Sequence, residues 1–295
     1  ASGYESFTGQ INVAHRNPDS AEPFHLNLFY GASGRMEFNH VSKHRVSRRW
    51  DTVLMTHGEY GQRVNDRNQD GFLDTPLRKD GVVRNEWRFV GDRGLRADIA
   101  LMGVDMVREG GMVAGDIVAT PWAATTEIQR AEVNAKVGYV LPGQEGRSWG
   151  SQWTASTHHH WHGFGYREYD GQQNTFRANV LRSGFLGSEN RQFSAGVSYL
   201  YDDFLERGTW GAAPTEVEAN PEKWARTEHV PGAFLETTWT GNPRGMVVAG
   251  LRVDQHNLWG TMVTPRLHAR WSATEQTSLK MVAGTGFRTP NVLRE

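Results

Sequence analysis

Apolar and polar residues alternate with a period of two along most of this 295-residue chain. In the segment 131–139 the odd-numbered positions hold Ala, Val, Ala, Val and Tyr, whereas the even-numbered positions hold Glu, Asn, Lys and Gly. Segments 193–201 and 263–271 repeat the pattern. Because a strand directs successive side chains to opposite faces, this period predicts strands with one apolar and one polar face. No comparable stretch follows the spacing of an amphipathic helix, so we expect an all-β fold.

About thirteen strands are expected, since weaker alternation marks ten further segments: 23–33, 35–44, 49–60, 82–91, 95–107, 147–162, 173–185, 228–240, 245–257 and 277–289. Their connections are alternately short and long. Short turns lie near 45–48, 92–94, 142–146, 188–191, 241–245 and 273–277, and long loops lie at 61–81, 108–126, 163–172 and 203–226, with shorter members at 33–35 and 258–261. Tight turns at one rim and long loops at the other are typical of an antiparallel up-and-down transmembrane β-barrel.

The two faces of these strands favour a barrel in a membrane. The apolar faces carry aromatic residues toward strand ends, as the girdles of outer-membrane barrels do, at Tyr139, Tyr199, Tyr201, Trp239, Trp271 and Phe287. The opposite faces carry charges at Glu132, Lys136, Arg177, Glu236, Arg252, Asp254, Arg266, Arg270, Lys280 and Arg288. A water-filled lumen tolerates such charges, whereas a packed core does not. The alternative is a large soluble β-protein with a solvated outer face and an aromatic core.

Composition excludes several other classes of protein. The 32 basic and 33 acidic residues give a net charge of −1, which indicates no nucleic-acid partner. Without cysteine the chain has no disulfide and no thiolate metal site. Apolar runs stay well below the roughly 18 residues that a membrane helix needs. Motifs for a nucleophilic serine, a phosphate-binding loop or a zinc protease do not occur, so we expect no enzymatic activity and no redox cofactor.

Several stretches resemble one family of membrane proteins. The segment 7–13 (FTGQINV), followed by Pro18 and Asp19, is similar to the end of a plug domain that leads into a first barrel strand. Near the other end lie GLRVD at 250–254, TPRL at 264–267 and GTGFRTPN at 284–291, and YDGQQ at 169–173 adds to the likeness. Together these motifs resemble the TonB-dependent outer-membrane receptors, which actively transport siderophores, haem, cobalamin and similar bulky ligands.

The resemblance implies a plug inside a barrel of 22 strands. Residues 1–20 would then be the C-terminal end of the plug, and residues 21–295 a partial barrel of about 13 strands. Because an odd number of strands leaves two unpaired edges, we expect this segment alone to be an open, curved sheet that transports nothing. The resemblance further implies the bacterial outer membrane and its lipid as surroundings. The TonB energy-transducing complex would be the partner, through a segment that this sequence lacks.

The loop segment 66–74 (DRNQDGFLD) has the spacing of a calcium-binding loop. Side-chain oxygens of Asp66, Asn68, Asp70 and Asp74 occupy ligand positions 1, 3, 5 and 9, and the carbonyl of Phe72 occupies position 7. Position 12 is a leucine, so the bidentate carboxylate is missing and any affinity should be weak. The sequence therefore leaves open a weak Ca²⁺ site or a polar loop without an ion.

Histidines and arginines on the expected lumen face are candidate ligand contacts. His158, His160 and His162 would share that face at about 6.6 Å spacing, from which imidazoles can contact a haem, a copper complex or a ferric chelate. Arg266, Arg270 and Arg288 would attract an anionic ligand. Ordinary wet-lumen histidines and structural ion pairs are the alternatives for the two groups.

The resemblance favours a receptor that takes up a bulky ligand, with a ferric siderophore first and a haem or cobalamin-like ligand next. A passive porin-like channel is one alternative, which the plug-like segment 7–13 disfavours. A soluble calcium-binding β-protein is another, which the segregation of turns and loops disfavours.

Overall fold

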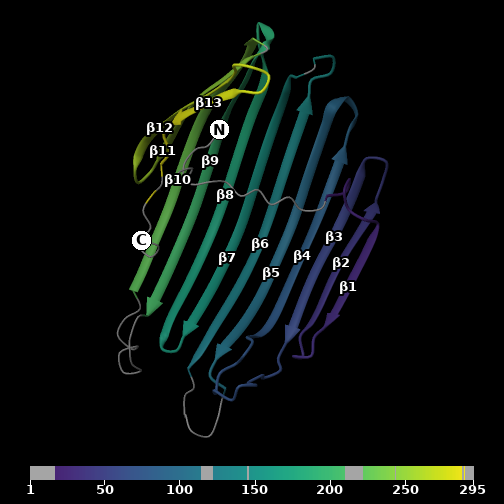
Figure 1. Cartoon of the computed structure of the whole chain (residues 1–295), viewed down its shortest axis with the longest axis vertical. Helices are drawn as coiled ribbons and strands as arrows, with labels where there is room; N and C mark the ends of the chain where they lie inside the picture. The colour runs from purple at the N-terminus through teal and green to yellow at the C-terminus, as the bar shows by residue number, and fades with distance from the viewer. Residues whose placement is uncertain are drawn as a thin grey trace.

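A computed structural model describes residues 17–113, 122–144, 146–209, 222–242, 244–287 and 289. These residues form one open antiparallel sheet of thirteen strands, each paired with its neighbours along the chain. The strands are β1 (Phe24–Tyr30), β2 (Met36–Arg45), β3 (Trp50–Gly61), β4 (Leu77–Val90), β5 (Leu95–Gly111), β6 (Ala123–Val140), β7 (Ser148–Phe164), β8 (Arg167–Leu186), β9 (Ser188–Thr209), β10 (Glu222–Asn242), β11 (Gly245–His256), β12 (Gly260–Ser272) and β13 (Ser278–Gly284). Figure 1 shows them tilted and side by side, from β1 at the right to β13 at the upper left. The expected all-β, open arrangement is confirmed.

The cross-strand register separates a polar face from an apolar face across the whole sheet. On the apolar face Val133 lies between Leu101 of β5 and Ala155 of β7. On the polar face Glu132 lies between Met102 and Ser156 of the same strands. Residues in register share a face, so the period of two seen in single segments extends from strand to strand.

Aromatic side chains of the apolar face gather near the rim of the short turns. Trp50 of β3 is in register with Phe89 of β4, their ring centroids 5.0 Å apart, and it meets Trp87 edge-on at 6.3 Å. Other members of this girdle are Tyr139, Trp149, Trp239 and Trp271. Tyr199 and Tyr201 instead lie well inside β9, because that strand runs far beyond the segment 193–201.

Apolar side chains are mostly exposed rather than packed into a core. The buried hydrophobic residues of the described chain are Ala21, Val53, Ala100, Phe204, Val230 and Met262. By contrast, Leu101, Val133, Trp153 and Val197 are between 45% and 58% exposed. A second layer that would cover this face is absent from the described residues, which form a single sheet. A continuous exposed apolar face is typical of a surface that contacts lipid and argues against the aromatic core of a soluble β-protein. No helix among the described residues is both long and apolar enough to cross a membrane.

The prediction of a long loop at 163–172 is wrong. β7 continues to Phe164 and β8 begins at Arg167, so only two residues connect them, and the segment 169–173 lies within β8. The strands beside the other long loops also extend further than alternation predicts. The reason is that both faces are polar near this rim, so the period of two fades although the strands remain paired. Alternation between short and long connections otherwise holds, with long ones at 62–76, 112–122 and 210–221.

Two predictions fall outside the described residues. Residues 1–16, which carry most of the proposed plug end, are not among them, and neither is Arg288. The plug assignment of residues 1–20 therefore stays a prediction.

The apolar face predicts a depth-dependent cost for charge. For the whole protein in lipid vesicles, Val133→Arg should lower the free energy of unfolding by about 2–4 kcal/mol, because it places a cation near the midplane of the apolar band. Gln129→Arg, on the same face of β6 but nearer the long-loop rim, should cost about 0–1 kcal/mol. Urea unfolding measures both, and equal losses would contradict a lipid-facing band.

Candidate functional site

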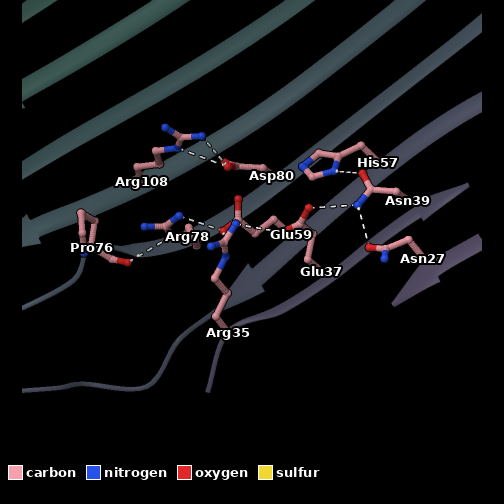
Figure 2. Close-up of polar contacts among 10 residues, drawn as sticks. All are labelled: Asn27, Arg35, Glu37, Asn39, His57, Glu59, Pro76, Arg78, Asp80 and Arg108. Carbon is pink, nitrogen blue, oxygen red and sulfur yellow. Dashed lines mark hydrogen bonds and ion pairs between the residues drawn. The ribbon is translucent and has the colours of Figure 1, made fainter. Parts of the chain in front are cut away.

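The polar face near the long-loop rim holds connected networks of charged and aromatic side chains, and we take it as the candidate site. One network, named here the rim charge cluster, consists of Arg35, Glu37, Glu59, Arg78, Asp80 and Arg108. Figure 2 shows these side chains pointing toward one another from β2 to β5 and from the turn before β2. Sequence reasoning missed this cluster, because its members come from several strands and only the register brings them together.

Register explains why the rim charge cluster needs its arginines. Glu37, Glu59 and Asp80 are direct cross-strand neighbours on β2, β3 and β4. Like charges in that position repel each other. Arg35 contacts both glutamates, and Arg78 Nη1 lies 2.8 Å from Glu59 Oε1. The three arginines thus balance three carboxylates.

Two of the three acidic members of the cluster are withdrawn from water. The side chains of Glu59 and Asp80 are only 6% and 2% exposed. Arg108 Nη2 donates a 2.7 Å hydrogen bond to Asp80 Oδ2. Buried carboxylates are stable only when paired and hydrogen-bonded. Figure 2 also shows the network continuing away from the rim, where Asn39 Nδ2 donates to Glu37 Oε1 at 2.9 Å and His57 Nδ1 lies 2.7 Å from Asn39 Oδ1.

The structure brings together His158, His160 and His162, named here the histidine ladder, on the polar face of β7. Adjacent ring centroids are 5.1 and 5.2 Å apart, closer than the strand spacing alone requires. His160 Nδ1 lies 3.1 Å from His158 Nε2. His162 Nδ1 lies 3.0 Å from Thr126 Oγ1 of β6. The predicted shared face is confirmed, whereas a ligand for these rings stays a prediction.

The neighbouring strand β8 holds the ladder in place. The ring of Tyr169 stacks on that of His160 with centroids 5.1 Å apart and planes 23° from parallel. The Tyr169 hydroxyl donates a hydrogen bond to Glu206 of β9. Gly171, in register with His160, leaves room for that ring, since a Cβ there would lie 2.8 Å from His160 Cε1.

A fourth histidine on the same strand faces the other way. His159 lies between two ladder residues in sequence, and its Nε2 is 3.0 Å from Asp170 Oδ2 on the opposite face of the sheet. Asp170 also lies 3.9 Å from Arg207 of β9. Gln129 of β6 is in register with His159 on this face, so polar side chains from neighbouring strands indicate that the apolar band has ended at this level.

The two described candidate arginines lie apart from the ladder, on β12, with β8 to β11 between them and β7. Arg266 Nε donates to His268 Nε2 at 2.6 Å. Arg270 is exposed and is in register with Met246 and Lys280. Among the described residues, the structure therefore does not gather the three histidines with Arg266 and Arg270 into one site.

A further buried network, not anticipated from the sequence, joins β9, β10 and β11. Arg252 donates to both carboxylate oxygens of Asp254 and, through Nη2 at 2.7 Å, to Ser198 Oγ. Asp254 is 1% exposed. Gly232 makes this possible, because a Cβ there would lie 2.2 Å from Asp254 Oδ1. Such tight packing indicates a structural role in the wall.

The predicted calcium loop belongs to the connection between β3 and β4 and is folded by its own side chains. Asp66 accepts hydrogen bonds from the backbone amides of Asp70 and Gly71, at 3.2 and 3.0 Å. Asp70 accepts one from the amide of Phe72 at 2.9 Å. Gly71 has φ = +82°, which suits the sharp turn that position 6 requires. Asp74, the last member, accepts from the amide of Arg67 at 2.9 Å.

The carboxylate oxygens of Asp66, Asp70 and Asp74 thus accept hydrogen bonds from backbone amides of the loop. Within the described ranges, no group of three or more His, Cys, Asp or Glu side chains is placed to hold a metal ion. The carboxylates retain further lone pairs, which leaves room for weak coordination. Calcium at Asp66, Asn68, Asp70, Phe72 and Asp74 stays a prediction.

Comparison with protein families gives one match that covers most of the chain. The β-barrel model of the TonB-dependent receptor-like family matches residues 48–294. No curated protein matches the chain by sequence.

Solved structures with a similar fold include proteins named as receptors and transporters. The copper transporter OprC aligns with a TM-score of 0.66 at 12% identity, over 91% of this chain and 45% of its own. The siderophore receptor PirA from Pseudomonas aeruginosa aligns with a TM-score of 0.56 at 12% identity, over 88% of this chain and 40% of its own. The unliganded ferric citrate transporter FecA aligns with a TM-score of 0.56 at 10% identity, over 90% of this chain and 43% of its own. At such identities the likeness establishes the fold alone. The chain spans less than half the length of each of these structures.

The rim charge cluster predicts a strong effect at its centre. Glu59→Gln should lower the free energy of unfolding of the full-length receptor by about 3 kcal/mol, because it leaves Arg35 and Arg78 without their shared carboxylate. Glu127→Gln, an exposed glutamate on the apolar face of β6, is the matched control and should change stability little. Urea unfolding would measure both variants. A Glu59→Gln protein as stable as the control would show that the cluster is not stabilising.

Proposed function

This chain belongs to the TonB-dependent receptor β-barrel family, and on that premise we propose that it forms part of a bacterial outer-membrane receptor that takes up a bulky metal chelate, with a ferric siderophore as the first candidate. Similar structures are named as a siderophore receptor, a ferric citrate transporter and a copper transporter. Their cargoes share a metal ion or its complex. Because this chain covers less than half of each, uptake is proposed for the whole receptor.

The observation that carries the proposal is a charged, hydrogen-bonded wall opposite an exposed apolar face. In a barrel of this family the apolar face would contact lipid and the polar face would line the lumen. The rim charge cluster and the histidine ladder both lie on the polar face toward the long-loop rim. In this orientation, ligand captured by the loops would first meet these side chains.

The nature of the wall suits recognition rather than bond-making. Its charges occur as balanced pairs, as in Arg78 with Glu59 and Arg108 with Asp80. The arginines are the more exposed partners, Arg78 at 22% and Arg108 at 46%, and can donate hydrogen bonds to a polar or anionic cargo. We therefore propose a receptor without enzymatic activity, whose uptake is driven by the TonB energy-transducing complex acting on a plug.

A passive porin-like channel is the main competing function, and dependence on energy separates the two. In cells with a ferric siderophore as the only iron source, the full-length receptor should support growth. Removal of the TonB complex should reduce iron uptake to the level of cells without the receptor. Radiolabelled iron uptake provides the measurement, with a general porin substrate as the control for membrane integrity. Uptake that persists without the TonB complex would favour the passive channel.

We also propose that the loop around Asp70 binds Ca²⁺ weakly, with a dissociation constant on the order of 10⁻⁴–10⁻³ M because the twelfth ligand is missing. The hydrogen bonds of Asp66 and Asp70 to the loop amides support this proposal, since they already impose the turn around Gly71.

Calorimetry of the full-length receptor tests the calcium proposal. Asp70→Ala should remove the calcium heat of one site, because it deletes a central ligand. Asp92→Ala, an exposed aspartate in the short turn between β4 and β5, should leave that heat unchanged. Equal heats in the Asp70→Ala and unaltered proteins would end the idea.

A further inference from the structure

We propose that His158 and His160 form an open, two-imidazole site for a divalent first-row transition metal ion, with Cu²⁺ bound most strongly. In the lumen wall this site would bind a metal ion reversibly and release it again. Its place on an uptake path rests on the proposed function, whereas the binding itself does not.

The separation of the two ring nitrogens fits one metal ion. Imidazole nitrogens bind Zn²⁺ or similar ions at about 2.0–2.1 Å, so two ligands at angles between square-planar and tetrahedral lie roughly 2.9–3.4 Å apart. His160 Nδ1 and His158 Nε2 are 3.1 Å apart. Without a metal they share one proton. On binding, that proton moves to the far nitrogen of its own ring, both rings turn so that their lone pairs converge on the ion, and no net proton is lost.

Burial determines which ring nitrogen of His158 can bind a metal ion. His158 Nδ1 is buried and has no hydrogen-bond partner within the described part of the chain, so Nε2 is the nitrogen of His158 that can reach an ion. The spacing i, i+2 places His160 on the same face of β7. This pairing of rings follows from the strand and does not need a flexible loop.

Three neighbours hold the rings before any ion arrives. Tyr169 stacks on His160 and is tethered to Glu206 on the next strand. Gly171 leaves the hollow in which the His160 ring lies. Thr126 Oγ1 lies 3.0 Å from His162 Nδ1, and the His162 ring contacts that of His160. Fixed ligand orientation raises metal affinity, because less side-chain freedom is lost on binding.

The two imidazoles fill only part of the coordination sphere of a metal ion, and this determines which ions bind and how tightly. Two imidazoles suit Cu²⁺, Ni²⁺ and Zn²⁺, and the divalent series places Cu²⁺ highest. No third His, Asp or Glu of the described residues converges on the pair. Remaining positions would be filled by water or by a chelator that arrives with the metal. Such a site binds reversibly and can pass an ion on.

The experiment uses the full-length receptor purified in detergent, with Cu²⁺ as the probe in a buffer that does not bind copper. Titration and electron paramagnetic resonance should show a site with two coupled imidazole nitrogens. His158→Gln and His160→Gln should each weaken this site at least about tenfold and reduce the nitrogen coupling. Gly171→Ala should weaken it less, because it displaces the His160 ring without removing a ligand.

His159→Gln is the matched control, since His159 is on the same strand but faces the opposite side of the sheet. It should leave copper affinity and the spectrum unchanged. Each variant is used only if it shows the heat-sensitive gel mobility of a folded barrel. Unchanged binding in both ladder variants, or an equal loss in His159→Gln, would overturn the proposal. Siderophore uptake by the unaltered receptor is measured separately from copper binding. An unaltered receptor that binds copper at this site but takes up no siderophore would count against the proposed function alone.

Discussion

The pairing of every strand with its chain neighbours is the constraint on which this structure depends. A sheet whose apolar face meets lipid has no water on that side to satisfy backbone amides and carbonyls, so the ladder between strands must satisfy them. The thirteen described strands are paired in unbroken order from β1 to β13. Pairing continues beyond the apolar band, where strands such as β9 reach 22 residues.

Register converts that pairing into chemistry. Because in-register residues share a face, Glu37, Glu59 and Asp80 become adjacent although they are far apart in sequence. Their repulsion is balanced by arginines from three different elements. The histidine ladder has the opposite origin, since its members share one strand and need only its period of two. The wall thus combines long-range charge pairing with short-range ring stacking.

Glycines shape this wall where a side chain must lie flat. Gly171 accommodates the ring of His160, and Gly232 accommodates the carboxylate of Asp254. In both places a Cβ would collide with the polar group of the neighbouring strand. The chain has 33 glycines among 295 residues, and some of them serve such contacts between strands rather than turns.

The sequence alone determined the number of strands, their approximate positions, the alternation of short and long connections and the common face of His158, His160 and His162. These features are local, because strand periodicity and turn composition are properties of a few consecutive residues. Only the tertiary structure decided where the strands end, as at Phe164 and Arg167, and which charged residues meet. Strand ends near the rim have two wet faces and hence no periodic signal, and ion pairs across strands depend on a register that no single segment contains.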